Sequence, residues 1–403
     1  MLKRLSQSIN SYGLVSLMVA PLLPAFMAKQ AVALCFFLIV LVNANELFRF
    51  RRRTHALMVL LFFLPGILVS LQVNPSQLIR LAPIIFLTLL APLRRSMGSP
   101  SLIFKVSVSL ILYCIAWQIA ILLGMPGSLE FRDIFYPYSA PVHPFNCNLL
   151  TEPQFCVSDT LFFSFARFRA AGIFFNPNQL SLILMILYAT AYGAWMAKNL
   201  SGPRSMHRFM LRCWPLSSLV LLAQYLTGSR TGLVTFFVFH LCLLIGGLIS
   251  NINLSFKYLL RSFSAIGVGV VSLIFLGLFS GSFVHVIKGF SAGDSLSTKL
   301  QLFLNYYSEI PLKAIVFGSS TDYFFDFEFG YFFGFGGLAA LLGIALFYWL
   351  LLKDNILLFP LIIALLLTSF TNSVMYSLLY SVLLIPAFIA SSLSPETRSS
   401  LLI

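Results

Sequence analysis

The residues best suited to chemistry lie where two arginines precede the start of an apolar helix. Residues 167–180 read RFRAAGIFFNPNQL, and a long apolar run follows them. Asn176 suits the N-cap of this helix, Pro177 suits its first position, and Asn178 follows in the first turn. A helix N-terminus presents unbonded N–H groups and partial positive charge, which together attract an anion. This helix start therefore predicts an anion-binding site.

The two arginines of this stretch indicate which anion would bind. Arg167 and Arg169 stand nine and seven residues before the N-cap. A guanidinium can hold phosphate oxygens through two parallel hydrogen bonds. The arginines and the helix start together predict a site for a phosphate or pyrophosphate group. The alternative is that the arginines contact only the phosphate groups of membrane lipids.

A second stretch, residues 226–233, repeats this arrangement and reads LTGSRTGL. Ser229 suits an N-cap, and Arg230 would enter the first turn of the helix that follows. A positive charge at a helix N-terminus is unfavourable for the helix itself. An anion bound to both Arg230 and the helix N-terminus would explain why an arginine stands there. The alternative is an arginine whose head group extends to the membrane interface.

Three carboxylates, Asp322, Asp326 and Glu328, lie close together among aromatic residues. An i, i+4 spacing would bring them to one face of a helix. Carboxylates held near a substrate can act as general bases, and aromatic faces suit sugar rings. The alternatives are a metal-binding acid pair and acids that merely solvate the end of a loop. No Cys and His spacing predicts a zinc site, and we expect neither a metal nor a cofactor.

The composition excludes a soluble enzyme, a disordered chain and a fibrous repeat. The chain has 403 residues, of which 59% are hydrophobic and 9% charged, whereas a soluble domain is about 45–50% apolar and about 25% charged. We expect an all-α polytopic integral membrane protein, with residues 1–403 forming a single domain of about 12 transmembrane helices. The expected spans are 10–28, 30–48, 56–73, 78–93, 101–124, 174–197, 213–228, 230–250, 263–281, 331–352, 355–371 and 373–392.

The distribution of charge predicts how these helices are oriented. An even number of spans puts both termini on one side, and the segments on that side carry the entire net charge of +14. Basic residues mark the cytoplasmic side of a membrane protein, so this charge orients helices and predicts no binding to nucleic acid.

Two long connections, residues 125–173 and 282–330, then face outward and are the expected place for function. Residues 295–309 have apolar positions at helical spacing, which predicts an amphipathic helix on the membrane surface. Cys147 and Cys156 lie together in the first connection, where an oxidising compartment would let them form a disulfide. The alternative is two free thiols.

Three elements resemble the O-antigen polymerase and O-antigen ligase superfamily, in order and spacing over roughly residues 160–390. They are the Arg-Gly-Phe-Asn-Pro-Asn pattern at 169–180, the Thr-Gly-Ser-Arg-Thr-Gly pattern at 227–232, and the acid- and glycine-rich run before the span at 331–352. The first five spans match only in hydropathy. The resemblance implies a metal-independent glycosyltransferase of the glycosyltransferase-C type in a bacterial inner membrane. Its donor is a glycan on undecaprenyl pyrophosphate, and its active face is periplasmic.

By this resemblance, Arg169 and Arg230 hold the donor pyrophosphate, and Arg167 assists them. Ligases of the superfamily carry a histidine in the last large outer loop, where this chain has Asp322 preceded by threonine. The resemblance therefore favours a polymerase over a ligase, with Asp322 activating the acceptor hydroxyl and the other two acids behind it. A transporter of lipid-linked glycans is a further alternative. The expected partners are lipid-linked oligosaccharides and membrane lipids, with a chain-length-regulating membrane protein as a candidate.

Overall fold

Every regular element in the described part of the chain is a helix. The computed structural model describes residues 2–23, 25–42, 50–75, 78, 81, 84–85, 87–88, 99–123, 125–128, 177–199, 206–251, 305–306, 308–319, 328–354, 358–369 and 383–387. No strand occurs within these ranges. The all-α prediction is therefore confirmed for the part of the protein that can be described.

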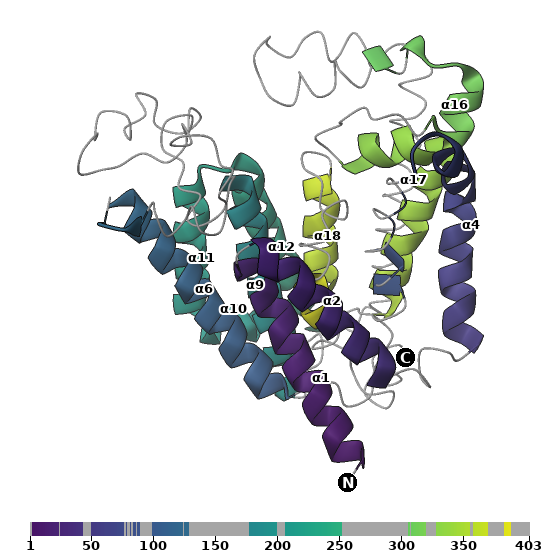
Figure 1. Ribbon diagram of the computed structural model, residues 1–403. Coiled ribbons are helices and arrows are strands. Elements are labelled where there is room, and N and C mark those ends of the chain that lie inside the picture. Colours follow the sequence, from purple (N-terminus) through teal and green to yellow (C-terminus); the bar gives the residue numbers. More distant parts are fainter. Residues whose placement is uncertain are drawn as a thin grey trace.

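The helices form two groups on opposite sides of the molecule (Figure 1). In chain order they are α1 (Leu2–Val19), the 3-10 helix η1 (Ala20–Leu22), α2 (Ala25–Val42), α4 (Phe50–Val73), α6 (Pro100–Leu122), α9 (Pro177–Lys198), α10 (Met206–Arg212), α11 (Trp214–Thr227), α12 (Arg230–Asn251), α16 (Leu312–Phe317), α17 (Glu328–Asp354) and α18 (Phe359–Ser369). Helices α6, α9, α10, α11 and α12 form one group and α4, α16 and α17 the other, and α18 contacts both α17 and α12.

Within the described ranges, three helices are long and apolar enough to cross a membrane, so the protein is a helical membrane protein. They are Pro100–Ile121, Asn178–Lys198 and Glu328–Leu351. Four shorter apolar helices accompany them, namely Ile9–Val19, Gln30–Ile39, Leu57–Val73 and Thr231–Gly247. The total of twelve spans stays a prediction, because several expected spans, such as 263–281, lie outside the described residues.

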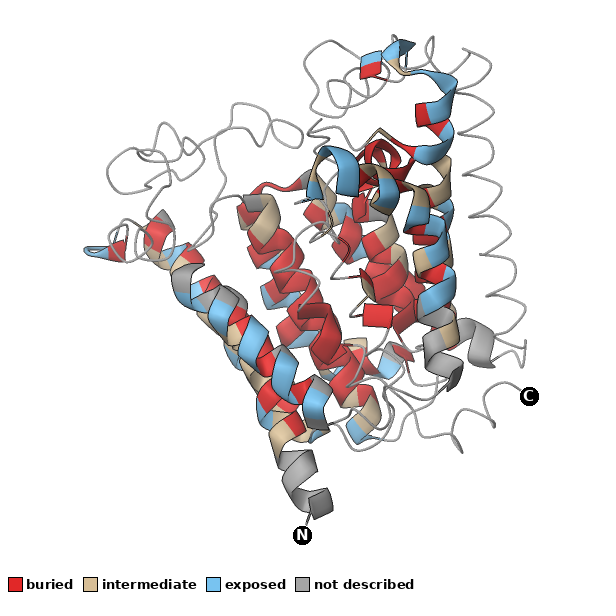
Figure 2. Ribbon diagram, turned by 45° about the vertical axis from the view of Figure 1, so that its right-hand side comes forward, coloured by how far each residue is buried: buried red, intermediate tan, exposed pale blue. Residues whose placement is uncertain are grey.

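Helix α9 is the centre of the bundle. In the most apolar stretch of α9, 89% of the residues are buried, whereas 33% are buried in the most apolar stretch of α6. Helix α9 contacts α6, α10, α11 and α12. Figure 2 shows buried residues concentrated in the central helices, while the outer helices have exposed faces. On α4 the exposed face is apolar and includes Leu57, Leu61, Leu64 and Leu68. An apolar outer face of this kind suits contact with lipid tails.

The expected boundary between the first two spans is wrong. Spans at 10–28 and 30–48 were expected, but α1 ends at Val19 and α2 begins at Ala25. Pro21 lies in the short 3-10 helix between them. Leu23, which precedes Pro24, is extended at φ −90° and ψ 157°, because a residue before proline is sterically excluded from the helical region.

The expected span at 331–352 is not one straight helix. Gly336 (φ −139°, ψ 17°) and Gly337 (φ 62°, ψ −150°) interrupt α17. In a straight helix Glu328 and Tyr348 would lie about 30 Å apart, yet the Tyr348 hydroxyl is 3.5 Å from Glu328 Oε1. Helix α17 therefore bends sharply and brings its two halves together. Its first residues, 328–330, belong to this helix and not to the expected connection at 282–330.

Glycines allow the bend to pack tightly against α4 and α16. A Cβ on Gly337 would lie 2.5 Å from the Ile315 carbonyl oxygen, and one on Gly66 would lie 2.6 Å from the Phe335 ring. The Ser319 N–H donates to the Gly334 carbonyl oxygen at 3.1 Å.

Helix α16 was not predicted from the sequence. Of the amphipathic helix expected at 295–309, residues 305–306 and 308–309 are described, and they are helical.

Candidate functional site

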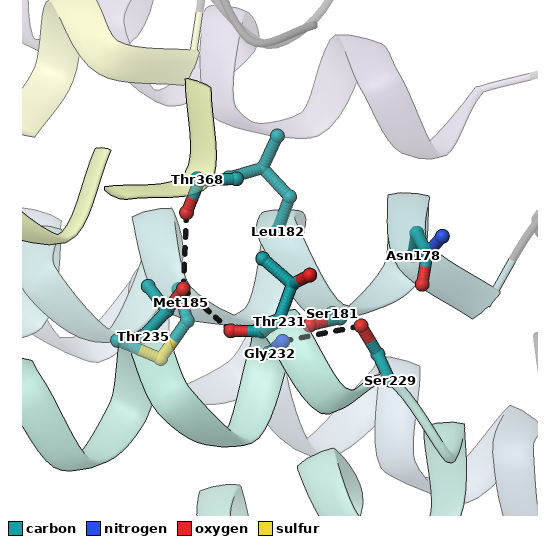
Figure 3. Close-up of a pocket in the computed structure, with 9 residues that line it drawn as sticks. All are labelled: Asn178, Ser181, Leu182, Met185, Ser229, Thr231, Gly232, Thr235 and Thr368. Carbon is teal, nitrogen blue, oxygen red and sulfur yellow. Dashed lines mark hydrogen bonds between the residues drawn. The ribbon is translucent and has the colours of Figure 1, made fainter. Parts of the chain in front are cut away.

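The N-termini of α9 and α12 meet at one small pocket (Figure 3). Asn178 lies in the first turn of α9, and Ser229 directly precedes α12. Both belong to the helix starts that the sequence singled out, although 51 positions separate them. Hydroxyl groups dominate the remaining polar lining. The lining residues are Asn178, Ser181, Leu182, Met185, Ser229, Thr231, Gly232, Thr235 and Thr368.

A short turn between α11 and α12 directs the start of α12 into this pocket. Gly228 ends α11 in the left-handed conformation, at φ 58° and ψ 20°. The Ser229 N–H then donates to Thr227 Oγ1 at 3.1 Å, and Ser229 Oγ accepts a hydrogen bond from the Gly232 N–H at 3.1 Å. The last contact is an N-cap bond, so the capping role predicted for Ser229 is confirmed.

A reciprocal pair of hydrogen bonds joins α9 to α11 beneath the pocket. Ser181 Oγ donates to Gln224 Oε1 at 2.6 Å, and Gln224 Nε2 donates to the Ser181 carbonyl oxygen at 2.8 Å. Helix α12 crosses this pair at Gly232, where a Cβ would lie 2.5 Å from Gln224 Oε1 and would overlap the Ser181 hydroxyl. Only glycine allows the three helices to approach so closely.

Helix α18 closes the pocket through a pair of threonines. The hydroxyl oxygens of Thr235 and Thr368 lie 3.0 Å apart. Each also lies near a carbonyl oxygen one turn back in its own helix, at 2.6 Å from Thr231 O and 2.8 Å from Ala364 O. Each hydroxyl has only one hydrogen. One threonine therefore donates to the other across the two helices, and the second donates to the carbonyl oxygen one turn back in its own helix. The pair therefore ties α12 to α18 at the pocket wall.

The pocket is small. Its free volume is about 10 Å³, which is about what a single water molecule needs. A pyrophosphate group would therefore have to lie at its opening, beside the starts of α9 and α12, and not inside it. There the partial positive charge of the two helix ends would favour an anion.

Several residues singled out from the sequence cannot be placed. Arg230 is the first residue of α12, but its side chain is not described. The others lie outside the described residues, and with them the predicted disulfide and two of the three acids: Arg167, Arg169, Asn176, Asp322, Asp326, Cys147 and Cys156. Of the residues singled out from the sequence, the structure therefore brings Asn178 and Ser229 together at one pocket, and it also describes Glu328, at the start of α17.

Glu328 lies at the start of α17 and is fully buried. The Tyr348 hydroxyl donates to its Oε1 at 3.5 Å and lies 3.1 Å from Ser369 Oγ. Ser369 in turn follows Thr368, which lines the pocket. The described carboxylate is therefore joined to α18 through the Tyr348 and Ser369 hydroxyls. No local pattern in the sequence singles out Tyr348 or Ser369. Tyr348 lies inside an apolar run, and Ser369 lies where another apolar run ends, in residues 368–373, which read TSFTNS.

A second polar cluster lies deeper in the bundle and is structural. His240 Nδ1 donates to the Phe236 carbonyl oxygen at 2.8 Å, so Nε2 is left to accept from the Tyr188 hydroxyl at 2.9 Å. The Tyr188 oxygen lies 2.6 Å from Ser217 Oγ. Each of these polar groups has its partner within the bundle, which is typical of side chains that join helices in a membrane.

Comparisons with known proteins identify no relative: no protein-family model matches the sequence, and no curated protein or solved structure is similar to it. Among the described residues, no group of three or more His, Cys, Asp or Glu side chains could hold a metal ion.

Proposed function

We propose that the protein is a membrane glycosyltransferase, an O-antigen-type polysaccharide polymerase. It would transfer a growing glycan from undecaprenyl pyrophosphate onto a lipid-linked repeat unit. The observation that carries this proposal is the meeting of two helix starts, at Asn178 and Ser229, on one pocket. Arginines accompany both helix starts in the sequence, and both stretches carry the resemblance to the superfamily.

In this proposal the helix starts and the arginines recognise the carrier's pyrophosphate. The N–H groups of α9 and α12 supply partial positive charge, and Arg169 and Arg230 supply full charges that can bind oxygens in pairs. These groups would stabilise the negative charge that grows on the pyrophosphate as the glycosidic bond breaks. Removing one preorganised donor of this kind lowers kcat by about 10²–10³-fold.

The proposed setting is a bacterial inner membrane with both termini in the cytoplasm. Basic residues between the expected spans support this orientation, since they carry the whole net charge of +14. The starts of α9 and α12 would then face the periplasm, where lipid-linked repeat units are joined. A ligase would use the same donor but attach the finished chain to the lipid A core.

Complementation of a deletion strain tests this proposal. The intact gene should restore long-chain polysaccharide, whereas the Arg169→Ala and Arg230→Ala variants should leave products with a single repeat. The matched control is Arg208→Ala, an exposed arginine on α10 that does not line the pocket. A tagged protein would confirm equal insertion. Normal chain-length ladders from both variants would refute the pyrophosphate site, and unattached long chains in the deletion strain would indicate a ligase.

A further inference from the structure

Helix α10 is held in place by one face and leaves the opposite face uncovered. Met206 and Phe209 are fully buried. The Phe209 ring packs against three aromatic rings of α9, at centroid separations of 5.6 Å to Tyr188, 5.2 Å to Tyr192 and 5.7 Å to Trp195. These contacts fix how this short helix is turned about its axis. The side chains of the opposite face are therefore presented in a defined direction.

The uncovered face combines two positive charges with apolar side chains. Arg208 and Arg212 are exposed and stand four residues apart, so they lie on one side of α10. Leu211 belongs to the same side and has 71% of its surface exposed, and Trp214, the first residue of α11, has 64% exposed. We call these four residues the α10 surface. Exposed basic and apolar side chains on one helix face are typical of contact with a membrane interface.

No acidic side chain from the neighbouring helices compensates these arginines. Helix α10 packs chiefly against α12, α11 and α9, and residues 160–293, which include all three, contain no Asp or Glu. Like charges four residues apart on a helix repel each other, and an anion bound to both arginines would remove this repulsion. The composition of the surrounding helices therefore indicates an anionic partner from outside the chain.

The α10 surface lies far from the pocket. Phe209 packs against the second half of α9, where Trp195 is 17 residues, or about 25 Å along the helix, from Asn178 at the pocket. The hydrocarbon core of a membrane is about 30 Å thick, so the long arginine side chains can extend to the head groups of the leaflet opposite the pocket. In the proposed orientation this is the cytoplasmic leaflet. Because of this distance, Arg208→Ala remains a suitable control for the pyrophosphate site.

We propose that the α10 surface binds an anionic phospholipid. The guanidinium groups of Arg208 and Arg212 hold the oxygens of the lipid phosphate. Leu211 and Trp214 contact the glycerol region and the upper acyl chains, the depth at which tryptophan is enriched in membrane proteins. A head group with net negative charge is favoured over a zwitterionic one, because its attraction to the two arginines is not offset by a positive charge of its own. The inference does not depend on the proposed transferase activity.

Quenching of tryptophan fluorescence by brominated lipids tests this inference, because Trp214 belongs to the α10 surface. Purified full-length protein is reconstituted in phosphatidylcholine vesicles. A small fraction of the lipid carries brominated acyl chains, on either phosphatidylglycerol or phosphatidylcholine. The chain has four tryptophans, so the difference between the wild type and Trp214→Phe isolates the emission of Trp214.

Three variants, each made with and without Trp214→Phe, identify the cause of any preference between the two lipids. The double variant Arg208→Gln/Arg212→Gln removes both charges, whereas Arg208→Lys/Arg212→Lys keeps them. The matched control is Lys105→Gln, which removes an exposed positive charge from α6. Thermal unfolding in detergent checks that each variant folds.

Brominated phosphatidylglycerol should quench Trp214 more strongly than brominated phosphatidylcholine at the same fraction. Each arginine beside an anionic head group favours binding about fivefold, so the double glutamine variant should quench equally with both lipids. The double lysine variant should keep most of the preference, and Lys105→Gln should keep all of it. The preference should also weaken as salt is added, because salt screens charges exposed to solvent.

Three results would overturn the inference. The first is equal quenching of Trp214 by the two lipids in the wild type. The second is a preference for phosphatidylglycerol that survives in the double glutamine variant. The third is a loss in Lys105→Gln as large as in that variant, which would assign the preference to the basic charge of the protein as a whole. If the double glutamine variant fails to fold, quenching in the wild type and in the double lysine variant still decides the matter.

Discussion

Gly232→Ala is the substitution whose effect follows most directly from the structure. Helix α12 crosses the Ser181–Gln224 pair at this glycine. The new Cβ would overlap the Ser181 hydroxyl and would lie 2.5 Å from Gln224 Oε1 and 3.0 Å from Ser181 Cβ. Either the reciprocal hydrogen bonds between α9 and α11 break, or α12 moves away from both helices.

The expected cost combines three contributions. Overpacking a tight contact costs about 1–3 kcal/mol, and leaving a buried amide without its partner costs about 1–3 kcal/mol. Alanine is favoured over glycine within a helix by about 1 kcal/mol, which offsets part of this. We therefore expect the free energy of unfolding to fall by about 2–4 kcal/mol. Activity should fall as well, because Ser181 and Gly232 both line the pocket.

Thermal unfolding of the purified protein in detergent measures this loss, and two further variants test its cause. Gly13→Ala is the matched control, since its Cβ would meet only the Ile39 side chain, at 3.1 Å from Cγ1 and 3.4 Å from Cδ1. Ser181→Gly removes two of the three atoms that clash and leaves Gln224 Oε1, so adding it to Gly232→Ala should restore part of the stability. The reasoning is refuted if Gly232→Ala is as stable as the wild type, or if Ser181→Gly gives no recovery.

Two further substitutions test local features of the fold. Ser229→Ala removes the cap bond to the Gly232 N–H and should lower the free energy of unfolding by about 1 kcal/mol, whereas an unchanged denaturation midpoint would contradict the capping role. Gly337→Ala forces a side chain into a left-handed position at φ 62°, 2.5 Å from the Ile315 carbonyl oxygen. It should lower the unfolding free energy by at least about 2 kcal/mol, measured in the same way, and a stable variant would show that the bend does not depend on glycine.

The starts of the central helices could be predicted because their signals are local. Helix α9 begins at Pro177 and α12 at Arg230, within three residues of the expected spans. Proline at a first helical position, and serine after a glycine that ends the preceding helix, act through the backbone of a few neighbouring residues. Such signals do not depend on what packs against the helix.

The bend in α17 could not be predicted, because hydropathy is continuous across it. Glycines are common inside membrane helices without breaking them, so Gly336 and Gly337 gave no warning in an apolar run. The bend depends on close approach to Ile315 of α16 and Gly66 of α4, which are distant in sequence. The same limit applies to the Ser181–Gln224 pair, whose members are 43 positions apart.

Buried hydroxyls of this bundle bond back along their own helix, and some, such as those of Thr235 and Ser369, also bond across to a neighbouring helix. Several buried hydroxyls bond to the carbonyl four residues earlier in their own helix, such as those of Thr88, Ser107 and Thr190. These bonds satisfy the hydroxyl and indicate nothing about function.

Other bonds cross between helices, joining Ser181 of α9 to α11, Thr235 of α12 to α18, and Ser369 of α18 to Tyr348 of α17. A cross-helix bond in a membrane contributes only about 0.6 kcal/mol, which is too little for three such bonds to determine how large apolar helices pack.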